Sequence, residues 1–568
     1  MKKDLKFSEY PFHLPNQKKI TTKLAGFIEL LKQAKDAKEA NVVIKKWNKY
    51  CNDVFTDSSV TYVLYTCNTD NKKYKKAQET WDELGPVIGD YGNQFSKILL
   101  DAPYRKELEA IYGEYLFKKY ELSFKTFDPK IIPDMIEENK LVSEYDALLG
   151  SAQIEFNGGV YNLSQMGKFA TDKNRETRKA ASIAKDNWLK ANEEKLGEIY
   201  DKLVHLRDGI AHKLGYKRFT ELAYDRLGRT DYNADLVANY RKQIYEDVVP
   251  VCQKLYKAQA KRIKIKNPQA YDYNLKFLTG NPVPAGDTKY LVEQAHKMYS
   301  DLGKESKEFF EFMMDHELFD LEARKGKAPG GYCTTFAKYK APFIFSNFNG
   351  TSGDVNVLTH EGGHAFQAYL SSGIKVPEYQ SPTLESCEIH SMSMEFFAWP
   401  YAEGFVGKDA NKYKYEHLAD AIEFLPYGAT VDEFQHWVYD NPNATPAERN
   451  AKFRELQRKY EPHLKFDDQP ALENGDRWLL QSHIFAVPFY YIDYTLAQVV
   501  AFQFAVEMNK NHEKTWKKYV KLCKMGGKLP FLGLLNKNHL RNPFEDGNIK
   551  KVIKPLEKIL KGIDTTSF

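Results

Sequence analysis

The sequence His360-Glu-Gly-Gly-His364 constrains the fold more than any other segment of this 568-residue chain. Histidines four residues apart on a helix project from one face, so their imidazole nitrogens can meet on a single metal ion. Glu361 is rotated by about 100° around the helix axis from His360. Its carboxylate would therefore lie beside such an ion, where a base for a water nucleophile is needed. The motif predicts a helix that carries two metal ligands and a base.

The residues around the motif predict that this helix is buried. It should run from about 355 to 372, because candidate N-cap residues precede it and Gly373 follows it. Gly362 and Gly363 lie in its interior and each costs about 1 kcal/mol relative to alanine. Two missing side chains make sense if a ligand or another backbone approaches closely. The alternative, a structural helix whose histidines are only hydrogen-bonded, explains neither the glycines nor the buried charge.

A catalytic zinc ion usually takes three protein ligands, so a further ligand should follow the motif. The segment Thr383–Trp399 predicts a second helix, since prolines flank it on both sides. Glu388 and Glu395 share one stripe of that helix, and Glu385 borders on the same stripe. His390 points about 200° away from Glu388, so it should not share a metal with it. Spacing alone favours Glu388 only weakly over the other two glutamates.

The motif and the helix that follows it together resemble a known family. The motif is followed, 24 residues after His364, by Glu388-Ile-His-Ser-Met-Ser-Met-Glu395. This pattern resembles the thimet oligopeptidase and oligoendopeptidase F peptidases, in particular the bacterial branch that includes the Pz-peptidases. One departure is Gly362, where many relatives carry a bulky apolar residue, and we expect it to enlarge the pocket. Further matching stretches are Gly330–Cys333, Pro342–Asn347, Pro488–Tyr494 and Asn542–Gly547.

The resemblance implies a zinc metallopeptidase. Its metal ligands would be His360, His364 and Glu388, which would hold one Zn²⁺ per chain. Glu395 would orient a ligand histidine, and Glu361 would act as the general base. The implied fold class is mainly α: two helical lobes that enclose a deep substrate channel, with a small β-sheet beside the zinc helix.

The segment from His483 to Tyr494 supplies candidate hydrogen-bond donors for the carbonyl oxygen of a peptide. Pro488 is expected in the first turn of a helix that bears the tyrosines. The resemblance implies that His483, Tyr491 and Tyr494 have the donor role. Tyr490 is a close alternative, because relatives differ here by one residue. Without the resemblance, ordinary core tyrosines would be the preferred interpretation, since the chain contains 37 of them.

Two segments predict β-structure within an otherwise helical pattern. Apolar residues alternate on either side of Asn157-Gly158-Gly159, which predicts a β-hairpin over Ala152–Leu163. The segment Tyr332–Asn349 is rich in Phe, Thr and Tyr and is split by Pro342. It predicts a strand just before the zinc helix. The resemblance implies that the edge of this strand pairs with an extended peptide substrate.

Composition limits the alternatives. Lys and Arg number 82 against 77 Asp and Glu, and no basic stripe stands out, which argues against nucleic acid as a partner. No apolar run reaches the roughly 18 residues of a membrane span, and no signal peptide is visible. Six scattered cysteines fit a reduced, cytoplasmic setting. No flexible linker is evident, so we expect packed lobes: an N-terminal helical lobe with the hairpin over 1–200 and a catalytic region over 201–568.

The sequence therefore predicts a zinc-dependent endopeptidase that acts on short peptides, with catalytic residues Glu361, His483, Tyr491 and Tyr494. Two other functions stay open. One is a zinc exopeptidase, a carboxypeptidase or aminopeptidase on a similar helical scaffold. The other is a non-catalytic peptide-binding protein with an accidental motif. A peptide blocked at both ends separates the first from an endopeptidase, and the metal content of the purified protein separates the second. The oligomeric state is not predicted.

Overall fold

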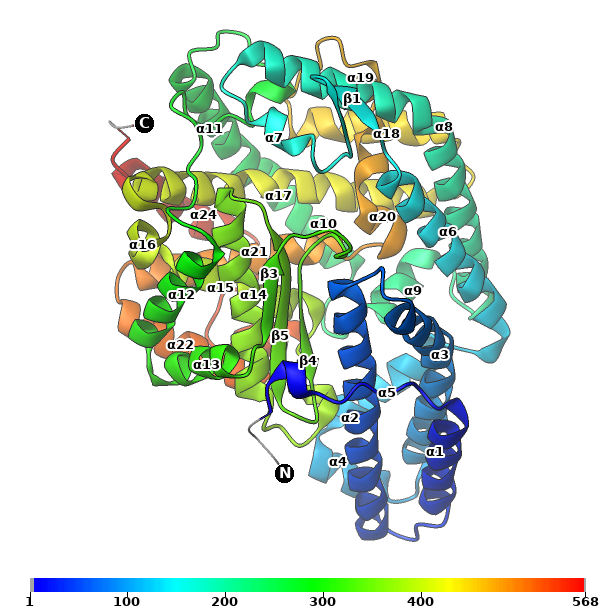
Figure 1. The fold of residues 1–568 in the computed structure, drawn as a ribbon. Helices are drawn as coiled ribbons and strands as arrows, with labels where there is room; N and C mark the ends of the chain where they lie inside the picture. Colours follow the sequence, from blue (N-terminus) through cyan, green and yellow to red (C-terminus); the bar gives the residue numbers. More distant parts are fainter. Residues whose placement is uncertain (1–4, 566–567) are drawn as a thin grey trace. The chain divides into compact units, whose positions relative to one another are not determined.

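The computed structural model describes residues 5–565 and 568, and these residues fold mainly into helices with two small sheets (Figure 1). The predicted mainly α fold class is confirmed. The chain forms two compact units, and each unit combines three stretches of sequence. The first unit takes residues up to 125, 283–407 and 507–539; the second takes 126–282, 408–506 and the residues from 540 onward. The domain boundary expected after residue 200 falls inside helix α8 (Arg175–Lys213).

The first unit begins with long helices whose starts are fixed by side-chain caps. Asn16, Asp36 and Asn71 each accept a backbone N–H from the first turn of the following helix. Such caps satisfy N–H groups that have no partner within the helix. The helices of this unit are α1 (Gln17–Lys32), α2 (Ala37–Cys67), α3 (Lys72–Asp101), α4 (Arg105–Tyr112), α5 (Glu114–Lys125), α12 (Thr288–Leu302), α13 (Lys304–Asp315), α14 (Ser352–Ser371), α15 (Leu384–Phe397), α16 (Ala402–Val406), α22 (His512–Met525) and α23 (Phe531–Lys537).

A three-stranded sheet in the first unit lies against α14 (Figure 1). Its strands are β3 (Phe319–Glu322), β4 (Tyr332–Phe336) and β5 (Ala341–Phe348), in the order β3-β5-β4. The strand that directly precedes α14 is β5, and it pairs with β3 in parallel and with β4 antiparallel. The segment Tyr332–Asn349 thus forms two strands rather than one, and the pairing of a strand edge with a peptide substrate stays a prediction. Within this segment, β5 is the central strand of the sheet and β4 is an edge strand.

The second unit contains the predicted hairpin. Strands β1 (Ile154–Phe156) and β2 (Gly159–Tyr161) pair antiparallel, with Phe156 opposite Gly159, which confirms the hairpin. Asn157 and Gly158 both have positive φ, as a tight two-residue turn requires. The helices are α6 (Ile132–Gly150), α7 (Gly167–Ala170), α8, α9 (Phe219–Arg226), α10 (Ala234–Gln243), α11 (Val249–Arg262), α17 (Ala410–Asp440), α18 (Pro446–Tyr460), α19 (Pro470–Asn474), α20 (Ser482–Ala486), most of α21 (Tyr491–Met508) and α24 (Asn548–Gly562).

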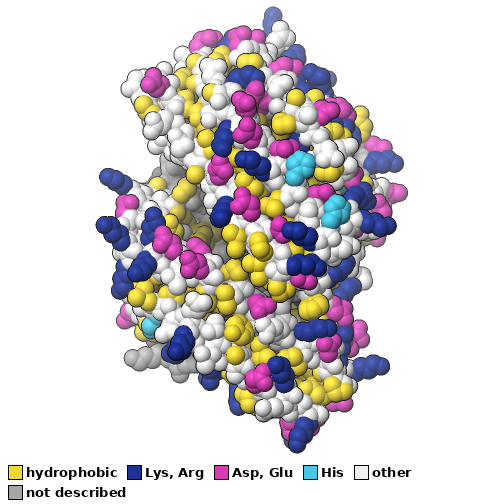
Figure 2. All heavy atoms as spheres, turned by 90° about the vertical axis from the view of Figure 1, so that its right-hand side faces the viewer, with side chains coloured by type: hydrophobic (Ala, Val, Ile, Leu, Met, Phe, Trp, Pro, Cys, Tyr) yellow, Lys and Arg dark blue, Asp and Glu magenta, His cyan; other side chains and the backbone are white. Residues whose placement is uncertain are grey.

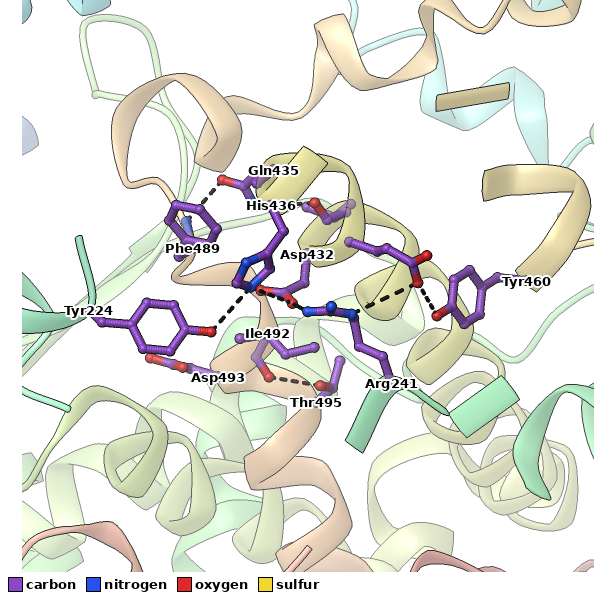
Figure 3. A network of polar contacts seen from close by, with 12 residues as sticks. Tyr224, Arg241, Asp432, Gln435, His436, Tyr460, Phe489, Ile492, Asp493 and Thr495 are labelled. Atoms are coloured by element: carbon purple, nitrogen blue, oxygen red, sulfur yellow. Dashed lines mark hydrogen bonds and ion pairs between the residues drawn. The ribbon is translucent and has the colours of Figure 1, made fainter. Parts of the chain in front are cut away.

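A buried polar network ties the helices of the second unit together (Figure 3). Asp432 on α17 forms an ion pair with Arg241 on α10 and lies 3.5 Å from Nε2 of His436. The Tyr224 hydroxyl on α9 lies 3.2 Å from the same histidine nitrogen. A buried carboxylate needs such partners, because an unpaired charge in an apolar interior costs several kcal/mol. The network fixes α9 and α10 against α17.

The surface carries charges of both signs. Figure 2 shows basic and acidic side chains interspersed over one face, without a basic stripe on that face. Among the described residues, none of the helices combines the length and the apolar character that a bilayer crossing requires.

Candidate metal centre

The structure brings together the three residues that were expected to bind metal. His360 and His364 lie on α14, and their ring centroids are 5.0 Å apart. Glu388 on α15 places Oε2 3.2 Å from Nε2 of His360 and 3.4 Å from Nε2 of His364. In the part of the chain that the structure describes, these residues form the one group in which three ligand atoms lie within 4.8 Å of one another. Two imidazole nitrogens and a carboxylate oxygen suit a zinc ion.

The spacing along α15 did not decide which glutamate is the third metal ligand, but the geometry distinguishes Glu388 from Glu395. Glu388 shares its helix face with Ser391, whose Oγ lies 3.0 Å from Oε2 of Glu388. Glu395 instead contacts His360 at its other ring nitrogen, with Oε1 2.6 Å from Nδ1. Such a contact fixes the ring orientation and turns Nε2 toward the other ligand atoms. His390 points away, and its Nδ1 lies 3.6 Å from the Cys523 sulfur.

The two glycines of the motif allow close packing around α14. A Cβ on Gly363 would lie 2.6 Å from the carbonyl oxygen of His390 and 2.7 Å from Cα of Ser391. The expectation that another backbone approaches closely is confirmed, and that backbone is α15. A Cβ on Gly362 would lie 2.1 Å from the Tyr299 hydroxyl. Tyr299 on α12 fills the space, so the expectation that Gly362 enlarges the pocket is wrong.

Replacement of Gly363 by alanine should destabilise the protein. Inside a helix this change normally stabilises by up to about 1 kcal/mol. Here the added methyl group meets the α15 backbone, and overpacking of this kind costs about 1–3 kcal/mol. Denaturant unfolding of Gly363→Ala and Gly26→Ala measures the difference. Gly26 also lies inside a helix of the first unit, but a Cβ there meets nothing within 4 Å. Equal midpoints for the two variants would contradict the close helix contact.

Glu361 follows the first metal-ligand histidine on α14, and its carboxylate is buried. The residue is only 9% exposed, and its Oε2 has no hydrogen-bond partner among the described residues. Burial raises the pKa of Glu361, and the neighbouring His360 and His364 partly offset the increase. A carboxylate whose pKa is raised toward neutrality is a better proton acceptor than an ordinary exposed one.

The cysteines near α14 and α15 do not offer a competing nucleophile. Burial raises the pKa of the Cys333 thiol well above its ordinary value, and the charge of Glu361 adds to the increase. Burial also raises the pKa of Cys387. The thiolate is the reactive form of cysteine. These thiols therefore behave as small apolar side chains.

In the second unit, the structure gathers the predicted carbonyl-oxygen donors around one histidine. Nε2 of His483 lies 3.4 Å from the Tyr494 hydroxyl. The ring of His483 is 5.1 Å from that of Tyr491 and 6.0 Å from that of Tyr490, measured between centroids. The amide nitrogen of Gln481 lies 2.9 Å from Nδ1 of His483. The amide can donate to Nδ1, which leaves the ring proton of a neutral histidine on Nε2.

The helix that carries these tyrosines begins later than expected. It starts at Tyr491, so the placement of Pro488 in its first turn is wrong. Phe489 adopts a left-handed backbone conformation, with φ 66°. Its carbonyl oxygen accepts from the Arg229 guanidinium at 2.6 Å. Its N–H donates to Gln435 Oε1 at 2.9 Å (Figure 3). Arg229 and Gln435 could not be predicted as partners of Phe489, because they lie more than 50 residues away and carry no local signal.

A His-Glu-x-x-His helix joined by a glutamate of the next helix defines the class of site: a metallopeptidase-type centre in a helical protein. Comparison with known families agrees with this class. The model of the peptidase M3 N-terminal domain matches residues 7–127, and the model of peptidase family M3 matches residues 169–552. The chain belongs to peptidase family M3.

Individual relatives resemble the chain to different extents. A structure of Pz peptidase A with an inhibitor has 47% sequence identity and a TM-score of 0.94, and the match covers 98% of this chain and 100% of that one. An oligoendopeptidase F homologue of Borreliella burgdorferi is 23% identical over 70% of each chain. A homologue of Mycoplasma genitalium is 23% identical over 55% of this chain, which spans about half (51%) of that relative. The resemblance to oligoendopeptidase F and the Pz-peptidases is confirmed.

Proposed function

We propose that the protein is a zinc-dependent endopeptidase that hydrolyses short peptides. The observation that carries the proposal is the group formed by His360, His364 and Glu388, with the buried Glu361 beside it. Two imidazoles and one carboxylate favour zinc over the oxygen-preferring cations Ca²⁺ and Mg²⁺. Three protein ligands leave a position for water, as in catalytic rather than structural zinc sites. Similarity to Pz peptidase A, whose solved structure includes an inhibitor, supports a peptide as substrate.

Each residue of the site has a separate role in the proposed reaction. A bound Zn²⁺ supplies Lewis acidity, which lowers the pKa of water and polarises a carbonyl group. Glu361 accepts a proton from the attacking water at its carboxylate and returns it to the leaving amine. Glu395 holds Nδ1 of His360, so that Nε2 is directed toward the metal position.

The second unit supplies hydrogen-bond donors for the carbonyl oxygen of the peptide. His483 carries a proton on Nε2 when Gln481 donates to Nδ1. We propose that this N–H and the hydroxyls of Tyr491 and Tyr494 stabilise the carbonyl oxygen as it gains negative charge. A well-placed donor of this kind contributes about 3–4 kcal/mol to catalysis. Tyr490 remains the alternative to Tyr491, since both rings lie close to His483.

Short peptides acetylated at the N-terminus and amidated at the C-terminus test the proposal. Mass spectrometry of the products should show internal cleavage, which disappears after treatment with a chelator and returns when Zn²⁺ is added. Intact blocked peptides, together with trimming of unblocked ones, would instead indicate an exopeptidase. A peptide-binding protein without activity would give no products and no stoichiometric zinc. A cytoplasmic setting and the absence of nucleic-acid binding stay predictions from the sequence.

A further inference from the structure

The second unit contains a cavity of about 490 Å³, which lies within the size range of small-ligand sites. Helices α8 and α17 form part of its wall, and residues of α7, α11 and the segments 270–276 and 461–480 contribute the rest. The wall is rich in aromatic rings and in charged side chains. None of its residues belongs to the metal-ligand group or to the set of proposed catalytic residues. The cavity is therefore distinct from both groups of residues.

The cavity shares a wall with the cluster around His483. Phe424 and Tyr427 line the cavity, and the ring of each lies edge-on to Tyr491 at a centroid distance of 5.7 Å. The Tyr427 hydroxyl also donates to Gln481 Oε1 at 2.8 Å, and the amide nitrogen of the same side chain contacts His483. A peptide whose carbonyl oxygen reaches the His483 cluster would therefore have a neighbouring part of its chain next to this cavity.

Most charges in the wall are already matched by neighbours. Lys276 forms ion pairs with Asp420 at 2.5 Å and with Glu423 at 3.0 Å. Arg477 contacts both carboxylate oxygens of Glu461 at 3.1 Å. Two carboxylates around one lysine make that wall unfavourable for a further anion. An anionic ligand would have to bind on another side.

Lys185 on α8 is the exception. It lines the cavity, and the described part of the chain provides it with no hydrogen bond or ion pair. The adjacent carboxylate of Asp186 is engaged elsewhere, since it accepts the backbone N–H groups of Ala471 and Leu472. Burial lowers the pKa of Lys185, which is the effect expected of a cation without a counter-ion. An anion at this position would compensate the charge of this half-buried side chain.

The rest of the wall suits side chains of a peptide. His463 stacks on Tyr256 with ring centroids 3.5 Å apart, and Tyr273 packs edge-on against both rings. Burial lowers the pKa of His463 to about 3, so its ring is neutral near pH 7 and contributes no second cation. Aromatic surfaces of this kind bury apolar side chains without fixing their identity.

We propose that this cavity is a peptide-end site, in which Lys185 binds the C-terminal carboxylate of a short peptide. The inference rests on the proposed peptidase function. Every unmodified peptide carries this carboxylate, whereas its N-terminal ammonium would be repelled by Lys185. The site would place the carboxyl-terminal part of the substrate beside the His483 cluster.

Paired peptides that differ only in a C-terminal carboxylate or carboxamide test the inference. Their dissociation constants are measured by calorimetry on the full-length Glu361→Gln protein, which should bind peptides without cleaving them. The acid should bind about tenfold more tightly than the amide, as expected for one charge-assisted contact. Adding Lys185→Met should abolish the difference, and adding Lys185→Arg should retain it.

The matched control is Lys190→Met in the same background. Lys190 lies on the same helix but does not line the cavity, and it pairs with Glu193 near the surface. This variant should keep the tenfold preference. Equal affinities for acid and amide, or a preference that survives Lys185→Met, would overturn the inference. A preference for the acid in a wild-type protein that cleaves no peptide would overturn the proposed function and leave the carboxylate site standing.

Discussion

Replacement of Glu361 by glutamine should lower the rate of peptide cleavage by about 10²–10⁴-fold while the metal content stays unchanged. The amide has nearly the same shape as the carboxylate but cannot accept a proton from water. The ligand atoms of His360, His364 and Glu388 are not altered by the change. The loss should therefore appear in kcat rather than in metal binding.

Initial rates on an end-blocked peptide, together with zinc measured per chain, check this prediction. The matched control is Glu322→Gln, a glutamate of β3 in the same unit that is exposed. It should cleave at the wild-type rate. Wild-type turnover in Glu361→Gln would refute its role as the base. Loss of zinc from that variant would show that the residue acts through metal binding instead.

Replacement of Arg229 by methionine should destabilise the second unit by about 3–5 kcal/mol. Arg229 and Asp493 form an ion pair at 2.6 Å, and both side chains are 0% exposed. Removing the guanidinium leaves Asp493 buried without this cation. The same guanidinium holds the carbonyl oxygen of Phe489 in its left-handed conformation. The variant should therefore also loosen the start of the helix that bears Tyr491.

Denaturant unfolding of Arg229→Met and Arg218→Met gives the comparison. Arg218 pairs with Asp440 in the same unit, but these side chains are 57% and 47% exposed. Exposed pairs contribute about 0–1 kcal/mol, so Arg218→Met should have little effect. Arg229→Met combined with Asp493→Asn should be less destabilised than Arg229→Met alone, because the amide has no charge to bury. An equal change in the free energy of unfolding for the two single variants would contradict a stabilising role for the buried pair.

The features predicted correctly from the sequence have local signals. The i, i+4 spacing of His360 and His364 indicates a shared helix face, and the structure places both on α14. Flanking prolines indicate the helix that became α15, and Asn157-Gly158 indicates the hairpin turn. Each signal lies within a few residues of the element that it specifies. Tertiary contacts did not override any of them.

The features that could not be predicted depend on contacts between distant residues. Tyr299 occupies the space at Gly362 from a helix some 60 residues earlier in the chain. Strand β5 is central because it pairs with β4 on one edge and with β3 on the other, and no residue of β5 indicates that β3 is its partner. Phe489 takes positive φ, which is rare for a bulky residue, because Arg229 and Gln435 hold its backbone. A single sequence does not reveal such pairs.

The interleaving of the two units has a consequence for how the protein is made. The first unit needs residues 507–539, and the second needs residues beyond 540. Neither can therefore close its core before the ribosome has added these segments. The growing chain should expose apolar helices until these segments have been synthesised, in contrast to proteins whose domains fold one after another from the N-terminus. Both units should therefore acquire their cores at a similar stage of synthesis, and not in the order in which their first helices emerge.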